Sequence, residues 1–232
     1  SNFSKSIFID SGWPEEKCVV IPHGVNKELF HDKTKNADID DGNFKFLNIS
    51  IPHYRKNIKL LVEAYYSAFK ESDHTNLIIK TSTKKPKLFF ECDVVKEIQT
   101  VQKKFSGKKL PKVTLLTHKY ESIIPTYNAC DCLVSASSSE GFGLPLLEGL
   151  AANMIVIAPN CTGQIDFLNA KNSLLVDVEK IPAKRVYQYW RPSDGAETYM
   201  PIIDDLSSQN SVNTNAKILK YLSIKFLIDS PN

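Results

Sequence analysis

The chain has 232 residues, of which 42% are hydrophobic and 24% charged, and its formal net charge at pH 7 is +3. This composition is ordinary for a globular protein, and the small charge excess gives no indication of a nucleic-acid ligand. No apolar run has the length of a membrane span, and no signal peptide is recognised.

The five cysteines form an odd set with no Cys-x-x-Cys pair, and no histidine stands at ligand spacing from them. Neither a disulfide framework nor a metal site is predicted, so we expect reduced thiols and no metal or other cofactor. Reduced, buried thiols are typical of cytosolic proteins. We therefore expect the chain in the cytosol or at the cytosolic face of a membrane.

The first forty residues predict a short helix and a strand before a polar loop. Residues 2–10 have a helical apolar pattern, and residues 18–21 are apolar and β-branched, which predicts a buried strand. Pro22 and Gly24 then end this strand. Residues 32–43 are polar and predict a loop.

The middle of the chain alternates short apolar strands with amphipathic helices. Strands are predicted at 44–49, 76–80, 113–117, 131–134, 155–158 and 173–176, and helices at 57–71, 93–105 and 123–129, with a further helix starting at 162. This alternation predicts an α/β fold, a Rossmann-like parallel sheet with helices on both faces. Ligands bind such sheets at the carboxyl ends of the strands.

Two cations stand immediately before the helix predicted at 57–71. Asn57 is a suitable N-cap, and Arg55 and Lys56 precede it, where the helix dipole disfavours positive charge. An anion that shares the site would explain this placement. The alternative is that both are ordinary surface cations of a loop.

The strand at 131–134 leads into the sequence Ser-Ala-Ser-Ser-Ser-Glu-Gly-Phe-Gly-Leu-Pro-Leu-Leu-Glu at residues 135–148. Its two glycines and the proline predict a turn into a helix start, where free backbone N–H groups attract anions and glycines permit close approach. Glu140 and Glu148 bracket this turn. Taken singly, Glu140 could be a solvated loop acid and Glu148 a residue that favours the helix dipole.

The joint pattern of Glu140, Gly-Phe-Gly, Leu-Pro and Glu148 resembles the signature of the retaining glycosyltransferases of family 4 (glycosyl transferases group 1). The resemblance implies the two-domain GT-B fold. It also implies that Glu140 faces the donor sugar and that Glu148 holds the ribose hydroxyls. The diphosphate would contact Lys56 and the backbone of Gly141, Phe142, Gly143 and Leu144. The segment 117–120, with Thr117 and His118, would contact the base.

Two positions depart from the family's pattern. A glycine and an arginine usually stand where this chain has Ser50 and Ile51, and Arg55 is the neighbouring cation that could supply the lost charge. Asp166 stands where the family usually has a glutamate, so its side chain is one methylene shorter.

The resemblance also implies a domain organisation. Residues 1–178 correspond to the nucleotide-sugar-binding domain, and residues 179–232 to a carboxyl-terminal extension that packs on it. This extension contains the aromatic residues Tyr187, Tyr189 and Trp190, for which packing is favoured over sugar binding, and a final helix at 216–228. The amino-terminal acceptor domain of such enzymes has no counterpart in these 232 residues, so we expect the chain alone to be incomplete for catalysis.

The resulting hypothesis is a glycosyltransferase that moves a sugar, with retention and without a metal, from a nucleoside-diphosphate sugar to a glycan, lipid or protein acceptor. In this hypothesis Glu140 and Lys56 are the catalytic residues. Two alternatives stay open at this stage: a catalytically silent module that binds sugar nucleotides, and a nucleotide-sugar epimerase of similar fold. An oxidoreductase is disfavoured because no Gly-x-Gly-x-x-Gly follows any predicted strand.

Overall fold

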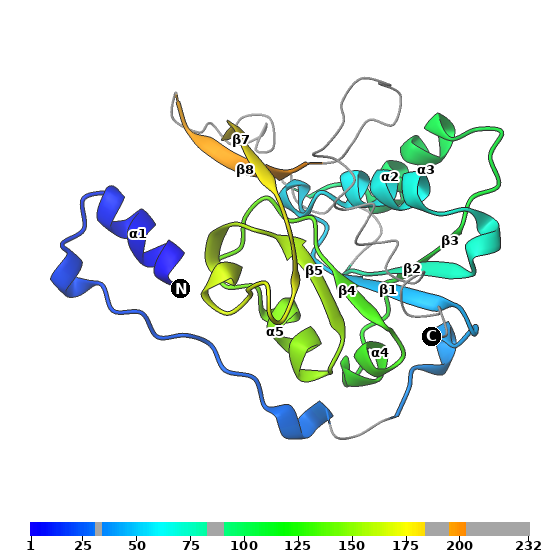
Figure 1. The fold of residues 1–232 in the computed structure, drawn as a ribbon, viewed down its shortest axis with the longest axis horizontal. Helices are drawn as coiled ribbons and strands as arrows, with labels where there is room; N and C mark the ends of the chain where they lie inside the picture. The colour runs from blue at the N-terminus through cyan, green and yellow to red at the C-terminus, as the bar shows by residue number, and fades with distance from the viewer. Residues whose placement is uncertain (31–33, 83–90, 184–194, 203–232) are drawn as a thin grey trace.

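The fold is built on one parallel sheet. The computed structural model describes residues 1–30, 34–82, 91–183 and 195–202. Six parallel strands lie in the order β3-β2-β1-β4-β5-β6 (Figure 1). Their bounds are β1 Phe44–Ile49, β2 Thr75–Lys80, β3 Lys112–Leu116, β4 Cys132–Val134, β5 Ile155–Pro159 and β6 Leu174–Val176.

Helices cover both faces of this sheet, as the sequence predicts. Figure 1 shows α2 (Ile58–Ala68) and α3 (Val94–Lys104) on one side and α4 (Ile124–Asn128) and α5 (Leu144–Ala151) on the other. Consecutive strand residues alternate between two hydrophobic cores: Phe46 packs with the α2 and α3 side, and Leu47 with the α4 and α5 side. Within the described ranges, no helix combines the length and the apolar character needed to cross a bilayer.

The strand order places two loops next to each other at the carboxyl edge. From β1 the chain builds β2 and β3 on one side, and then returns to place β4 on the other side of β1. β1 and β4 pair in parallel, with Phe46 opposite Cys132 and Leu47 opposite Leu133. The loops that follow β1 and β4 therefore leave the sheet side by side, at the topological switch point where doubly wound sheets bind their ligands.

The amino-terminal segment confirms one prediction and corrects another. The predicted helix is α1, Asn2–Asp10, capped by the Ser1 side chain. The predicted buried strand at 18–21 is wrong: these residues form no strand, and Val19 and Ile21 are 80% and 83% exposed. An extended apolar run becomes a strand only when a neighbour supplies the ladder hydrogen bonds, and the described part of the chain offers none. Figure 1 shows this segment running outside the sheet.

Short 3-10 turns occupy much of the remaining chain before and between the larger elements. Phe30, in η2 (Lys27–Phe30), and Ile39, in η3 (Ala37–Ile39), are buried in the core on the α4 side. Because η3 lies within residues 32–43, the loop predicted there is partly structured. The helix predicted at 57–71 ends earlier, at Ala68, and η5 (Glu71–Asp73) follows it.

After β6, the described chain forms a two-stranded antiparallel sheet of β7 (Val178–Pro182) and β8 (Glu197–Pro201). The aromatic residues Tyr187, Tyr189 and Trp190 and the helix predicted at 216–228 lie outside the described residues.

One carboxylate ties three strands together at the amino edge of the sheet. Asp41 Oδ2 accepts hydrogen bonds from Asn76 Nδ2 of β2 at 2.8 Å and from Lys112 Nζ of β3 at 2.9 Å. Its Oδ1 lies 3.4 Å from Nζ of Lys45, a buried residue of β1. Burial opposes ionisation of Asp41, but the hydrogen bonds from Lys112, Asn76 and Asn43 outweigh it and hold the pKa of this carboxyl well below its usual range.

We expect Asp41→Asn to lower the free energy of unfolding by about 1 kcal/mol at pH 7, because it removes the charged acceptor of these bonds. The folded pKa lies below the unfolded value of about 3.9, so the stabilisation is present above that value and is lost as the pH falls. The difference between the variant and the unaltered chain should narrow from pH 5 to pH 3 in urea titrations. Glu16→Gln, at an exposed position, is the control, and a difference independent of pH would contradict this role.

Candidate functional site

The site forms where the loops after β1 and β4 meet. The β1 loop ends in η4 (Tyr54–Lys56), which is capped by His53: its Nδ1 accepts a hydrogen bond from the Arg55 backbone N–H at 3.1 Å. Burial, together with the charges of Arg55 and Lys56, lowers the pKa of His53, which favours the neutral ring that can accept this bond. η4 thereby fixes the two cations against the β4 loop.

Asn57 joins the two loops. It stands at the N-cap position of α2, as predicted, but its side chain does not cap the helix. Its Nδ2 donates instead to Ala136 O at 2.9 Å and to Ser138 Oγ at 2.7 Å, across the gap to the β4 loop. The backbone of Asn57 is left-handed, with φ of 51°, a conformation that asparagine tolerates better than most residues. The capping prediction is thus replaced by a cross-loop contact.

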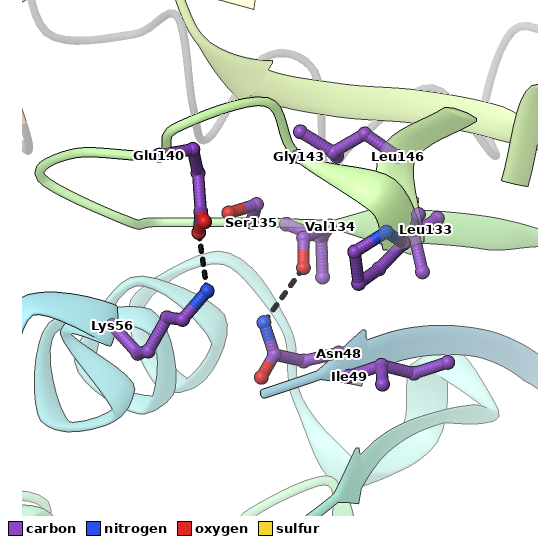
Figure 2. Close-up of a pocket in the computed structure, with 10 residues that line it drawn as sticks. Asn48, Ile49, Lys56, Leu133, Val134, Ser135, Glu140, Gly143 and Leu146 are labelled. Atoms are coloured by element: carbon purple, nitrogen blue, oxygen red, sulfur yellow. Dashed lines mark hydrogen bonds and ion pairs between the residues drawn. The ribbon is translucent and has the colours of Figure 1, made fainter. Parts of the chain in front are cut away.

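Lys56, Arg55 and Glu140 form the charged centre of the site. Lys56 Nζ forms a hydrogen-bonded ion pair with Glu140 Oε1, as the dashed line in Figure 2 shows. Arg55 Nη1 lies 3.2 Å from Glu140 Oε2 and donates to Ser139 O at 2.5 Å. Lys56 is only 9% exposed. One carboxylate therefore faces two cations, and the trio carries a net charge of +1.

The surroundings of the ion pair lower the pKa of both Glu140 and Lys56. Burial opposes ionisation of Glu140, but the charges of Lys56 and Arg55 outweigh it and hold the pKa of Glu140 below its usual range. Burial lowers the pKa of Lys56 despite the attraction of Glu140, and the charge of Arg55 acts in the same direction as burial. A second anion would relieve the repulsion between the two cations.

The start of α5 presents backbone amides beside this trio. Its N-cap is Gly143, whose φ of 94° is accessible to glycine, and no side chain caps the helix. Among the described residues, none accepts a hydrogen bond from the backbone N–H of Gly141, Phe142, Gly143 or Leu144. The Phe142 ring packs between His23 and Phe167, at centroid distances of 5.2 and 5.0 Å. The predicted role of Phe142 thus concerns its amide, because its side chain anchors the turn.

The backbone of the β4 loop is held from outside by η6 (Thr162–Asp166) and by α1. Glu140 N donates to Thr162 Oγ1 at 3.0 Å, and Gly163 N donates to Glu140 O at 2.9 Å. Ser1 Oγ and Ser4 Oγ donate to Gly141 O at 2.5 and 3.2 Å. Asp166 accepts a hydrogen bond from the Asn2 backbone N–H at 2.7 Å, at the start of α1. These contacts hold the carbonyl oxygens of Glu140 and Gly141 from the side of η6 and α1. They thereby fix the orientation of the peptide groups at the start of the turn.

Glu148 lies farther along α5 and does not touch Glu140, the other acid of the motif. Its Oε2 accepts a hydrogen bond at 2.5 Å from the hydroxyl of Tyr127, a buried residue of α4. Sequence reasoning missed Tyr127, because a tyrosine in a short apolar helix carries no signal of a polar contact with another helix. The two acids of the motif therefore have different partners.

A groove of about 390 Å³ opens beside the trio along the carboxyl ends of β1 and β2. It contains two further polar residues that sequence reasoning missed, Lys80 and Thr81. Thr81 is 2% exposed, and its Oγ1 has no hydrogen-bond partner among the residues that the structure describes. In the sequence, the available signal was a lysine followed by a threonine at the carboxyl end of the predicted strand 76–80. The lining residues are Ile49, Ser50, Ile51, Arg55, Lys56, Lys80, Thr81, Ser82, Ile123 and Pro145.

Among the predicted site residues, Arg55 and Lys56 alone line this groove. Two of the others belong to the loop after β3. Thr117 and His118 follow β3, which pairs with β2 on the side away from β1. The His118 ring stacks edge-on with Tyr120 at 6.4 Å, and Lys80 Nζ lies 5.7 Å from the Tyr120 ring centroid. The loop after β3 is therefore linked to the groove through the contact of Tyr120 with Lys80, a lining residue at the end of β2. Base contact by Thr117 and His118 stays a prediction.

The interior of the site is nearly closed. Figure 2 shows the side chains of Lys56 and Glu140 pointing toward one another. Together with Asn48, Val134, Ser135 and Gly143, they line a cavity of about 10 Å³. A volume of this size holds about one water molecule. Any larger ligand must therefore lie in the open groove and against the α5 amides, or displace the ion pair. Within the described residues, no group of three or more His, Cys, Asp or Glu side chains is arranged to hold a metal ion.

A comparison with known protein families shows the family of the chain. The profile described as glycosyl transferases group 1 matches residues 45–187, more than half of the chain. The chain belongs to this family. The match contains both the Lys56 loop and the Glu140 turn, so the geometry described above is that of a group 1 glycosyltransferase.

Individual relatives agree with the family. The chain is 26% identical over 190 residues to a probable sucrose-phosphate synthase of Thermosipho melanesiensis, covering 77% of this chain and 41% of that protein. It is 30% identical over 138 residues to an alpha-monoglucosyldiacylglycerol synthase of Streptococcus pneumoniae, covering 58% of this chain and 28% of that protein. The chain thus spans less than half the length of these curated relatives.

A solved structure shows the same fold. The sucrose-phosphate synthase of Thermosynechococcus elongatus superimposes with a TM-score of 0.56 at 22% identity, covering 75% of this chain and 43% of that chain. The parallel sheet is therefore the Rossmann-like sheet of the carboxyl-terminal half of a GT-B glycosyltransferase, as predicted.

The contact between η6 and the glycosyltransferase motif gives a test of the loop geometry. A Cβ added at Gly163 would lie 2.1 Å from Gly141 O, a backbone atom that cannot rotate away. We expect Gly163→Ala to lower the free energy of unfolding by about 1–3 kcal/mol, as other overpacked sites do. Gly24→Ala is the control, because a Cβ at that exposed position meets nothing within 4 Å. Equal urea midpoints for the two variants would contradict this packing.

Proposed function

We propose that this chain is the donor-binding half of a retaining glycosyltransferase of the family 4 type, which transfers a sugar from a nucleoside-diphosphate sugar to an acceptor. The observation that carries the proposal is the meeting, at the switch point of the sheet, of two cations and a row of backbone amides that donate to none of the described residues. Lys56 and Arg55 reach the same carboxylate from the β1 loop, and the Gly141 to Leu144 amides begin α5 beside it.

The leaving diphosphate is the group that this arrangement suits. When the bond between the anomeric carbon and the phosphate oxygen breaks, negative charge develops on the diphosphate. Fixed amides and cations stabilise this charge without a nucleophile and, in this proposal, without a metal. Arg55 supplies the cation that the family's usual arginine would provide, since Ile51 is apolar and Ser50 Oγ donates to Asn48 Oδ1 at 2.8 Å.

Glu140 and Glu148 have separate roles in this proposal. Glu140 leaves Lys56 and Arg55 when the diphosphate arrives, and its carboxylate then orients the sugar or stabilises positive charge at the anomeric carbon. The acceptor hydroxyl oxygen forms the new bond on the face from which the diphosphate departs, and its proton passes to the departing phosphate oxygen. Attack from that face gives retention. Glu148 accepts hydrogen bonds from the ribose hydroxyls, because a carboxylate can accept two donors. The base lies near Thr117 and His118, toward the groove that contains Lys80 and Thr81.

The acceptor and its binding residues belong to a part of the enzyme beyond these 232 residues. The proposal places the protein in the cytosol, because its five unpaired cysteines suit a reducing compartment. A catalytically silent binding module is the second candidate, and the replacement of the usual glycine and arginine by Ser50 and Ile51 is the observation that favours it. Both candidates bind a nucleoside diphosphate, but only the first releases it from a nucleotide sugar.

Binding of UDP, GDP and ADP, measured by calorimetry, tests the donor site. We expect one of them to bind the unaltered chain and Glu148→Ala to weaken that binding at least about tenfold, or about 1.4 kcal/mol. Glu71→Ala, at an exposed position 62% accessible at its side chain, is the control. Unchanged affinity in Glu148→Ala would show that Glu148 does not bind the nucleotide. If the unaltered chain binds none of the three diphosphates, the proposal is overturned.

A second variant, Glu140→Gln, should strengthen diphosphate binding, whereas Glu148→Ala should weaken it. Since Glu140 occupies both cations in the free protein, Glu140→Gln should bind the same diphosphate more tightly, by up to about tenfold. In an enzyme that also contains the acceptor domain, release of diphosphate from the corresponding nucleotide sugar should fall in this variant, because the carboxylate that acts on the sugar is gone. Weaker binding of the diphosphate by Glu140→Gln would show that the ion pair does not compete with the ligand.

A further inference from the structure

Tyr127 makes a polar contact that core packing does not require. Its side chain is fully buried in α4, with its ring edge-on to Phe30 at 5.7 Å. Its hydroxyl crosses to α5, where it donates to Glu148 Oε2 at 2.5 Å and lies 3.4 Å from Pro145 O. The short contact is therefore with the carboxylate, and the backbone carbonyl is only a distant second acceptor.

This contact fixes one oxygen of Glu148 and leaves the other available. Among the described residues, Tyr127 provides the only hydrogen bond to the Glu148 carboxylate, so Oε1 has no protein donor. Burial and the negative charge of Glu148 raise the pKa of Tyr127 far above its usual range. The phenol consequently stays protonated throughout the working pH range and can always donate.

We propose that Tyr127 is a positioning residue, which holds the Glu148 carboxylate so that Oε1 and the free lone pair of Oε2 face the two vicinal hydroxyls of the nucleotide ribose. This inference rests on the function proposed above. A glutamate side chain has three rotatable bonds, and a carboxylate that must bind a diol loses affinity when it can turn away from it. The tyrosine thereby contributes to preference for ribose over deoxyribose without touching the ligand.

The test compares ribonucleotides with their 2′-deoxy counterparts. The probe is whichever of UDP, GDP and ADP binds the unaltered chain, together with dUDP, dGDP or dADP. In Tyr127→Phe, which keeps the ring and its contact with Phe30, affinity for the ribonucleotide should fall by about five- to tenfold. Affinity for the deoxynucleotide should fall less, by about two- to threefold, because this probe keeps the 3′-hydroxyl but lacks the 2′-hydroxyl that the positioned carboxylate also binds.

Two further variants separate positioning from a general loss of structure. Tyr65→Phe removes another fully buried hydroxyl, which contacts Thr75 Oγ1 at 2.8 Å and Lys112 O at 3.1 Å at the opposite edge of the sheet. It should leave the ribose preference unchanged. The double variant Tyr127→Phe with Glu148→Gln should bind the ribonucleotide no more weakly than Glu148→Gln alone, because Tyr127 acts through Glu148.

The outcomes separate the two proposals. Equal losses for ribonucleotide and deoxynucleotide in Tyr127→Phe would assign Tyr127 a structural role and overturn the inference, while the donor site would stand. An unchanged preference of Tyr127→Phe for the ribonucleotide over the deoxynucleotide would also overturn the inference and leave the donor site in place. Absence of nucleotide binding by the unaltered, folded chain would overturn the proposed function and, with it, this inference.

Discussion

The site depends on one carboxylate shared between two cations at the switch point of a parallel sheet. Lys56 and Glu140 are 84 positions apart in sequence. They meet because β1 and β4 are neighbouring parallel strands, so the loops that follow them begin at the same edge of the sheet. A lysine that is 9% exposed requires a partner, because burial alone disfavours its charged form. Glu140 provides that partner but leaves the trio with a net positive charge. The free protein is thus stable and still attractive to an anion.

The rest of the local structure holds this charge arrangement in place. Asn57 ties the two loops together, Thr162 and Gly163 bind the backbone of Glu140, and Phe142 anchors the turn between two aromatic rings. None of these contacts uses the amides that begin α5. Donors that are fixed before a ligand arrives need no reorganisation when charge develops, which is the property that a site for a leaving diphosphate requires.

Most of the fold could be predicted from the sequence, and the failures have a common cause. The six strands and four helices of the sheet region follow from local apolar periodicity, which each segment carries by itself. The segment at 18–21 has the same apolar, β-branched character, but it is exposed and forms no strand. Periodicity reports that a segment suits a strand, whereas pairing depends on a neighbour that the local sequence does not specify. Asn57 shows the same limit, since its position at a helix start was correct and its hydrogen-bond partner was not.

By itself, the sequence determined the alternation of strands and helices, the glycine-containing turn between Glu140 and Glu148, and the two cations, Arg55 and Lys56, that precede α2. Only the tertiary structure decided that both cations share Glu140, that Tyr127 holds Glu148, and that Lys80 and Thr81 lie in the same groove as Lys56. The physical reason is that the first set is encoded by neighbours along the chain. The second set depends on strand order and helix placement, which bring together side chains from segments whose separation in sequence gives no sign of contact.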